Sequence, residues 1–343
     1  MVEVKKLGVL LEKTTDGFEI DGVLNPAIIQ EKQVIHVFYR AVAKNNYSSI
    51  GCCKLNAAHE ITERSAMPML FPQFDYESHG VEDPRIVQIE GTYYLTYTAY
   101  DGVNALGALA TSVNLMHWEK HGIIVPQIVY ADFVRLAETK NPLNEKYARY
   151  NSTHGILDKQ GKKMLLWNKN VVFFPRKINN KFYFLQRIKP DIQIVGFSDF
   201  LELTPEFWQN YFMGIKDCIV LSPKLDHEIS YIGCGAPPIE TEKGWLLIYH
   251  GVHDSVNGFV YSACVALLDL EHPEKEISRL SYPLFFPEQT WELQGEVNNV
   301  CFPTGTTVSG DTLYIYYGAA DERIAYASVS LSELLTELTL NAQ

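Results

Sequence analysis

Five segments of the chain share one pattern of apolar and polar positions. Each has an apolar strand, tyrosine-rich in most cases, then a short polar turn, then a second strand that contains Ala, Gly or Ser. Two such strands around turn residues predict a β-hairpin, and the small residues allow neighbouring sheets to pack closely. The sequence therefore predicts hairpins at residues 34–55, 92–112, 181–198, 244–270 and 311–331.

These repeats fill nearly the whole chain, and their spacing leaves room for a four-stranded unit each. A fixed internal repeat of short strands is typical of a β-propeller. The sequence thus predicts an all-β fold, a single five-bladed β-propeller domain over residues 1–343. Two stacked β-sandwiches are the alternative, and the even spacing argues against them.

Two segments depart from the alternating pattern. Residues 126–160 look partly helical, and an insertion of this length is commonly a lid or a binding loop; a decoration without a role is the alternative. The last segment, at about 330–340, has apolar residues at helical spacing with Ser330 or Ser332 as the N-cap. This C-terminal helix is expected to pack outside the propeller or on a partner subunit.

The charge and the termini exclude several classes of partner. The net charge of −12 repels phosphate backbones, so a nucleic-acid partner is not expected. A compact anion would need a local cationic pocket. The chain start lacks the apolar core of a signal peptide, and no apolar run is long enough for a membrane span. We therefore expect a cytoplasmic protein without a membrane partner.

Cysteine and glycine patterns give no sign of a cofactor or a metal. The six cysteines lack metal-ligand spacing, so reduced core residues are expected. The chain also lacks the phosphate-loop, dinucleotide and metalloprotease motifs.

The most specific chemical pattern is Glu82-Asp83-Pro84-Arg85, just before the second repeat. Pro84 is expected to restrict Asp83 to an extended conformation. Arg85 could orient or ionise one carboxylate, while the other acid stays protonated and donates a proton. A solvated turn is the alternative, because Asp-Pro is common in turns.

A second pattern places cations beside apolar runs. Lys169-Asn170 precedes one strand of a predicted hairpin, and Arg187 ends the other. Cations in such a place predict an anion or a carboxylate between them. Surface cations that snorkel beside the strands are the alternative.

Single polar residues accompany the other repeats, and each alone is a weak candidate. Together they place a polar residue at every blade, which a site on a propeller axis requires. The candidates are Asn25, Arg40, Glu228, His250, Tyr261 and Asp321.

Several of these motifs occur together and in one order. LNPA, FYRA, VEDPRI, KNVVFFPRKI, IGCGAPPI, IYHGV, LLDL, FPTG and LYIYYGAAD follow one another from about residue 20 to 330. In this the chain resembles glycoside hydrolase family 130, the mannoside phosphorylases and related mannosidases. The resemblance implies a five-bladed propeller that cleaves a terminal β-linked mannose with inversion. It also implies that Asp83 is the proton donor, acting through the 3-hydroxyl of the sugar.

The same resemblance assigns the remaining residues to two groups. Phosphate would be bound by Lys169, Asn170, Arg187, His250 and Tyr261. The sugar would be bound by Asn25, Arg40, Glu82, Arg85 and Asp321. The chain departs from the family twice in the phosphate group, because an arginine is here Lys169 and a lysine is here Tyr231. A lysine lacks the planar two-point grip of arginine on a phosphate.

Three functions stay open on the sequence. A phosphorylase would use inorganic phosphate as co-substrate and release α-mannose 1-phosphate. An inverting mannosidase would use water activated by a carboxylate, for which Glu228 is the candidate base. A carbohydrate-binding propeller without catalysis is the third. The expected partner is a small oligosaccharide with β-1,4 or β-1,2 linkage, and a homo-oligomer stays open.

Overall fold

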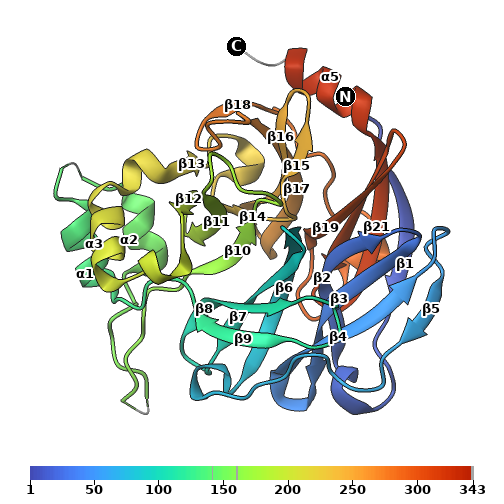
Figure 1. Ribbon diagram of the computed structural model, residues 1–343, viewed down its shortest axis with the longest axis horizontal. Helices are drawn as coiled ribbons and strands as arrows, with labels where there is room; N and C mark the ends of the chain where they lie inside the picture. Colours follow the sequence, from blue (N-terminus) through green and yellow to red (C-terminus); the bar gives the residue numbers. More distant parts are fainter. Residues whose placement is uncertain (141, 160, 341–343) are drawn as a thin grey trace.

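The computed structural model describes residues 1–140, 142–159 and 161–340, and it is built mostly of antiparallel β-strands (Figure 1). The largest of its four sheets divides where β4 and β6 share a single parallel residue pair, Ser48 with Gly80. The strands thus form five groups. They are β2(Gly22–Glu31), β3(Val34–Ala43), β4(Tyr47–Leu55) and β5(Ile61–Arg64); β6(Gly80–Ile89), β7(Thr92–Tyr100), β8(Ala105–Ser112) and β9(Glu119–Ile123); β10(Lys169–Phe173), β11(Phe182–Ile188), β12(Asp191–Phe197) and β13(Ile219–Leu221); β14(Tyr231–Cys234), β15(Ile239–Thr241), β16(Gly244–Ser255), β17(Gly258–Leu268) and β18(Glu276–Arg279); and β19(Cys301–Ser309), β20(Thr312–Ala319), β21(Arg323–Ser330) and β1(Lys5–Leu11).

All five predicted hairpins are confirmed, because each predicted segment contains two consecutive antiparallel strands of one group. The sequence did not reveal that β1 pairs with β21, so that the N-terminal strand completes the last group. This pairing joins the two ends of the chain within one sheet.

The five groups contact one another in a closed cycle. The first strands β2, β6, β10 and β14 contact in succession, β19 contacts β16 and β17, and β19 also contacts β2. The apolar core follows the same order, because each of its five buried clusters lies between two consecutive groups. The fifth cluster closes the cycle, because it contains Tyr316 of the last group together with Val37 of the first.

Four of the groups repeat one buried polar network. In each, the hydroxyl of a tyrosine on the second long strand donates to a glutamate that precedes the group, and a cation from the outer strand pairs with that glutamate. The cation-to-carboxylate distances are 3.0, 2.6, 3.0 and 2.7 Å. The sets are Tyr39, Glu19 and Arg64; Tyr97, Glu77 and Lys120; Tyr249, Glu228 and Arg279; and Tyr317, Glu292 and Lys6.

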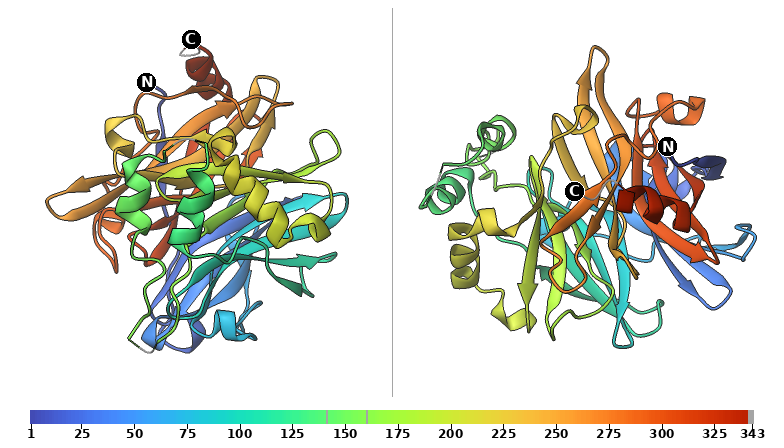
Figure 2. Two further views of the ribbon diagram at one scale, coloured as in Figure 1. Left: turned by 90° about the vertical axis from the view of Figure 1, so that its left-hand side faces the viewer. Right: turned by 90° about the horizontal axis from the view of Figure 1, so that it is seen from above.

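Helices lie outside the sheets. The segment predicted as partly helical contains α1(Tyr130–Ala137) and α2(Glu145–Asn151), which confirms that prediction, although residues 141 and 160 of it lie outside the described residues. Helix α1 packs on α3(Pro205–Met213), and Figure 2 shows all three helices together on one side. A single turn, α4(Thr290–Leu293), precedes β19.

The predicted C-terminal helix is confirmed as α5(Leu331–Leu340). Ser330 accepts a hydrogen bond from the Glu333 amide at 3.2 Å and so caps the first turn, while Ser332 donates to Asp311 instead. The buried face carries Leu334 and Leu338, which join the cluster between the fourth and fifth groups.

The six cysteines are free thiols, and five of them are buried, as the sequence predicted. None of the helices within the described residues has the length and apolar character needed to cross a membrane.

Candidate active site

The cycle of first strands surrounds a cavity of about 190 Å3 to which all five groups contribute side chains. Most of the predicted site residues line it. They are Asn25 and Arg40 from the first group, Asp83 from the second, Lys169, Asn170 and Arg187 from the third, Tyr261 from the fourth and Asp321 from the fifth. Residues far apart in the sequence thus meet in one place because the groups are arranged in a cycle.

Three of these residues sit at breaks in the strand register. Asn25, Asp83 and Asn170 have φ values of 51°, 49° and 56°. Each lies at a bulge, where the pairing of its strand shifts by an extra residue. A bulge re-aims a side chain, and positive φ is tolerated best by Asn and Asp. The strand ends are therefore built to turn these polar groups into the cavity.

The predicted extended conformation of Asp83 is wrong. The steric effect of Pro84 disfavours the right-handed helical region, but the bulge places Asp83 in the left-handed region instead. The same combination occurs at Asn25, which also precedes a proline.

Asp83 is buried and held by two neighbours. Its Oδ1 accepts a hydrogen bond from Asn25 Nδ2 at 2.7 Å and lies 3.8 Å from an Arg40 nitrogen. Burial opposes ionisation of Asp83, but the charges of Arg40 and Lys169 and the Asn25 hydrogen bond outweigh it and lower the pKa. Without a sugar in the cavity, Asp83 is therefore a carboxylate at neutral pH.

Asp321 faces the same cavity with the opposite tendency. Burial raises its pKa to about 6, opposed by Arg40 and supported by the nearby charge of Asp83. Two carboxyl groups whose environments push their pKa values apart are typical of a site that moves protons.

The third group supplies the cations of the cavity. Lys169 and Arg187 are opposite each other across the β10–β11 pair. The ammonium of Lys169 lies 3.6 Å from Glu82, which also pairs with Arg40 at 2.9 Å. Within the described residues no carboxylate lies within ion-pair distance of Arg187, so its charge faces the cavity uncompensated.

Lys169 and Arg187 form the cationic wall of the cavity, and a histidine and two tyrosines lie next to it. His250 is fully buried beneath Arg187, with 3.4 Å between His250 Nε2 and an Arg187 nitrogen. Burial, and then the charges of Arg187 and Arg85, lower the pKa of His250 well below its usual value. The hydroxyls of Tyr231 and Tyr261 are hydrogen-bonded at 2.5 Å. Tyr261 belongs to the cavity lining, whereas the predicted phosphate-binding residue His250, and Tyr231, lie outside it and contact Arg187 and Tyr261 from behind.

Two predicted sugar-binding residues lie behind the cavity wall. Arg85 is fully buried and donates to the carbonyl oxygens of Gly235, Asp83 and Pro84, so it does not bind a carboxylate as the sequence suggested. Glu82 is occupied by Arg40 and Lys169. Both residues position the strand end that carries Asp83.

Glu228 lies outside the cavity lining and belongs to the repeated network described above. It is fully buried, pairs with Arg279 at 3.0 Å and accepts the Tyr249 hydroxyl. Three other groups have an equivalent glutamate, so its place is explained by the fold and argues against a role as base. Its neighbours His227 and Cys264 offer metal-ligand atoms within 4.8 Å, but burial raises the pKa of the Cys264 thiol and disfavours a thiolate ligand.

Apolar residues of the lining were missed by sequence reasoning. Phe302, Val297 and Val300 line the cavity beside Tyr261. An isolated apolar residue cannot be distinguished from a core residue in the sequence, although the FPTG motif already marked Phe302.

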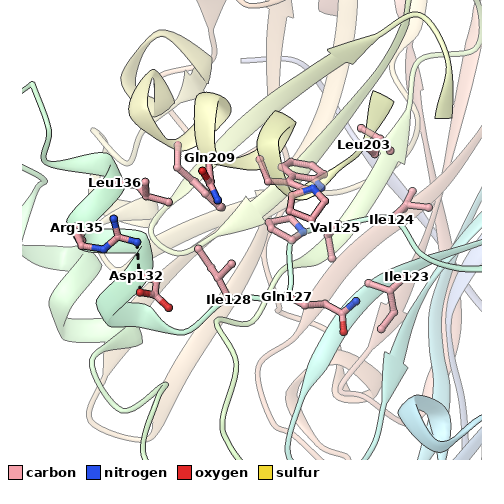
Figure 3. Close-up of a pocket in the computed structure, with 14 residues that line it drawn as sticks. Ile123, Ile124, Val125, Gln127, Ile128, Asp132, Arg135, Leu136, Leu203 and Gln209 are labelled. Carbon is pink, nitrogen blue, oxygen red and sulfur yellow. Dashed lines mark ion pairs between the residues drawn. The ribbon is translucent and has the colours of Figure 1, made fainter. Parts of the chain in front are cut away.

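A separate cavity of about 380 Å3 lies between α1 and α3, and both apolar and polar side chains line it (Figure 3). Its charged residues Asp132 and Arg135 pair with each other at 3.5 Å. None of the predicted site residues lines it.

Comparisons with known proteins point to one family. The sequence model of a family described as beta-1,4-mannooligosaccharide phosphorylase matches residues 18–339. A 1,2-beta-oligomannan phosphorylase of Thermoanaerobacter sp. (strain X514) is 32% identical, over 97% of this chain and 99% of that protein. A beta-1,2-mannobiose phosphorylase of the same strain is 33% identical, over 91% of each.

One solved structure agrees in fold over nearly the full length. The beta-1,2-mannobiose phosphorylase of Listeria innocua, in complex with beta-1,2-mannobiose, has a TM-score of 0.73 at 22% identity. The match covers 98% of this chain and 99% of that one.

Proposed function

The chain belongs to glycoside hydrolase family 130, the mannoside phosphorylases, and we propose that it cleaves a terminal β-mannoside with phosphate as nucleophile. In this proposal Asp83 donates the proton and the product is α-mannose 1-phosphate, formed with inversion. The supporting observation is the uncompensated guanidinium of Arg187, which lines the same cavity as Asp83.

Phosphorolysis and hydrolysis differ in what must lie opposite the acid. A hydrolase needs a second carboxylate to activate water. The carboxylates that line the cavity are Asp83 and Asp321, and both are coupled to the same guanidinium of Arg40. A phosphorylase needs hydrogen-bond donors and positive charge, which Lys169, Asn170 and Arg187 supply. This composition supports phosphate.

The protonation states of the two aspartates fit an acid that is ionised before the substrate binds. Asp83 is a carboxylate while Asn25 and Arg40 compensate it. A mannoside that displaces water and takes up part of these contacts would raise the pKa of Asp83. Asp83 would then take up its proton as the sugar binds. Asp321, with a pKa of about 6, is the neighbouring group that retains a proton nearest to neutral pH.

The fold that carries this site is proposed to be a single five-bladed β-propeller over residues 1–343. Five strand groups in a closed cycle, five core clusters between them and four copies of one polar network support it. Propellers use the channel where their inner strands converge as a binding site.

The proposed substrates are β-1,2-linked manno-oligosaccharides. Two relatives matched over at least nine tenths of this chain are named for β-1,2 substrates, whereas the matching family model is named for β-1,4 substrates. Initial rates on β-1,2- and β-1,4-mannobiose will decide, with the β-1,2 substrate expected to have the higher kcat/KM.

The test of the reaction type is a rate measurement with and without phosphate. Phosphate-dependent loss of mannobiose is expected, and equal release of free mannose without phosphate would contradict phosphorolysis. Asp83→Asn tests the acid, and turnover should fall by about 10²–10⁴-fold because general acid catalysis is lost. Sugar binding, measured by calorimetry, should survive; unchanged turnover would refute the role of Asp83.

A further inference from the structure

Lys189 is a further basic residue near the cavity. It belongs to none of the sequence motifs named above, and it is not among the residues that line the cavity. It follows β11, two residues beyond Arg187. Its carbonyl accepts a hydrogen bond from Asn151 Nδ2 at 2.7 Å, and the carbonyl of Pro190 accepts one from the Ile232 amide at 3.0 Å. The backbone at Lys189 is therefore fixed between α2 and β14.

The side chain of Lys189 lies against aromatic rings. Its Nζ is 3.8 Å from the centre of the Tyr231 ring and 5.7 Å from that of Tyr150. The guanidinium of Arg187 lies 5.7 Å from the same Tyr231 ring, whose hydroxyl contacts that of Tyr261 in the cavity lining. One tyrosine thus joins Lys189 to the cationic wall.

Lys189 has no counter-ion within the part of the chain that the structure describes, since no carboxylate lies within ion-pair distance of its ammonium. Cation–π contacts stabilise an ammonium by only about 0.5–2 kcal/mol, less than the cost of burying an unpaired charge. Burial, and then the charges of Arg187 and Lys169, lower the pKa of Lys189 to about 6. At neutral pH it is therefore mostly a neutral amine.

The surrounding polar atoms also lack partners. Arg187 Nε and His250 Nδ1, both of which can donate, are buried without a hydrogen bond. Unsatisfied buried groups are rare unless a ligand or water completes them. Positive charge, unused donors and a lysine ready to accept a proton together describe a site that an anion would complete.

We propose that Lys189 is a phosphate-binding residue that takes up a proton when the phosphate dianion binds beside Arg187 and Lys169. This inference rests on the proposed phosphorolysis. The amine of Lys189 gains one proton from the buffer, and no covalent bond to the protein forms or breaks. The dianion supplies the negative charge that makes the ammonium favourable, so phosphate affinity and proton uptake are linked.

The test compares Lys189→Met, Lys189→Arg and wild type in titrations with inorganic phosphate at pH 8. Calorimetry in two buffers of different ionisation enthalpy counts the protons taken up. We expect uptake approaching one proton per phosphate in wild type, and that uptake should be absent in both variants. Lys189→Met should raise the Kd and the KM for phosphate by about ten- to a hundredfold, as expected for loss of a charged hydrogen bond.

The readouts separate a binding role from a structural one. The KM for mannobiose should stay within about twofold in Lys189→Met, and Lys189→Arg should keep phosphate affinity within about tenfold of wild type because it keeps the charge. Lys177→Met is the matched control. Its ammonium lies 4.6 Å from the Phe182 ring and pairs with Glu90 at 2.8 Å, outside the cavity lining, and it should leave all constants unchanged.

The proposal is overturned if Lys189→Met leaves phosphate affinity unchanged, or if it weakens mannobiose and phosphate equally. If Lys189→Met does not fold, proton uptake decides between wild type and Lys189→Arg, and equal uptake in the two overturns it. Free mannose from wild type at equal rates without phosphate is a different result. It refutes the proposed function through wild type alone, and this proposal with it.

Discussion

The opposite pKa shifts of Asp321 and Asp83 predict opposite effects on stability. The pKa of Asp321 is raised from 3.8 to about 6, so its ionisation destabilises the folded state above pH 6 and has no effect below the unfolded value. Asp321→Asn should therefore increase the free energy of unfolding at pH 7.5, by up to about 3 kcal/mol, with no gain near pH 3.5. Denaturant titrations at the two pH values measure it.

Asp83→Asn is the matched comparison. The pKa of Asp83 is lowered in the folded state, so its charge stabilises the fold above the unfolded pKa, and this contribution is lost as pH falls through the folded value. Neutralising it should lower the free energy of unfolding at pH 7.5. An equal sign of change for both variants at pH 7.5 would refute this assignment of charges.

Asp83, Asn25 and Asn170 could be selected from the sequence by their chemical type and by the apolar strands beside them. Their left-handed backbone was not predictable, because a bulge depends on how two strands pair and not on the hydrophobic pattern of one strand. Lys189 could not be selected for the same reason, since its approach to Tyr231 depends on the contact of β14 with β11.

Helices α1 and α2 show how an element with a weak sequence pattern takes part in both core and site. Phe133 and Tyr147 of these helices are buried in the cluster that also contains Phe212 of α3. Tyr150 of α2 lies 5.3 Å, between ring centres, from Tyr231, and His154 stacks on Trp167 at 5.6 Å. The insertion therefore reaches the cavity wall, and its deletion would also expose core residues.

Point variants test whether this insertion selects the acceptor sugar. Tyr150→Ala removes a ring of the insertion that contacts Tyr231, and Trp167→Ala removes the ring on which His154 of the insertion stacks and over which Lys169 lies. Both variants should change the preference among mannose, glucose and N-acetylglucosamine in the reverse reaction. The KM for α-mannose 1-phosphate should change less. Tyr130→Ala, in the same insertion but facing Phe133, is the control. An unchanged acceptor profile in both ring variants would exclude the insertion from acceptor choice.

The cycle of strand groups is closed by contacts between residues far apart in the sequence, which no local sequence pattern predicts. The hairpins were predictable because their two strands are neighbours in the sequence, and the alternation of apolar and polar residues with a turn between them is visible there. The pairing of β1 with β21, and the four repeated tyrosine–glutamate–cation sets, join residues distant in sequence. Lys6 of β1 belongs to one such set, with Glu292 at 2.7 Å and both side chains buried.

Lys6→Met should destabilise the protein by about 3–5 kcal/mol, because it leaves Glu292 buried without its partner. Lys54→Met, which breaks the exposed pair with Glu63, should cost less than about 1 kcal/mol. Chemical denaturation of both variants at equal pH and salt measures the difference. Equal effects would show that the buried Lys6–Glu292 pair adds no more to stability than an exposed pair.

NMR of the first products tests whether phosphate attacks the mannosyl carbon while Asp83 provides the proton. Wild-type protein, β-1,2-mannobiose and phosphate are followed by ¹H and ³¹P spectra from the first turnover onward. We expect equal amounts of α-mannose 1-phosphate and mannose from the first turnover, formation about 10²–10⁴-fold slower with Asp83→Asn, and no cleavage without phosphate. Two equivalents of mannose per mannobiose with no mannose phosphate, or the β-phosphate, would contradict phosphorolysis with inversion.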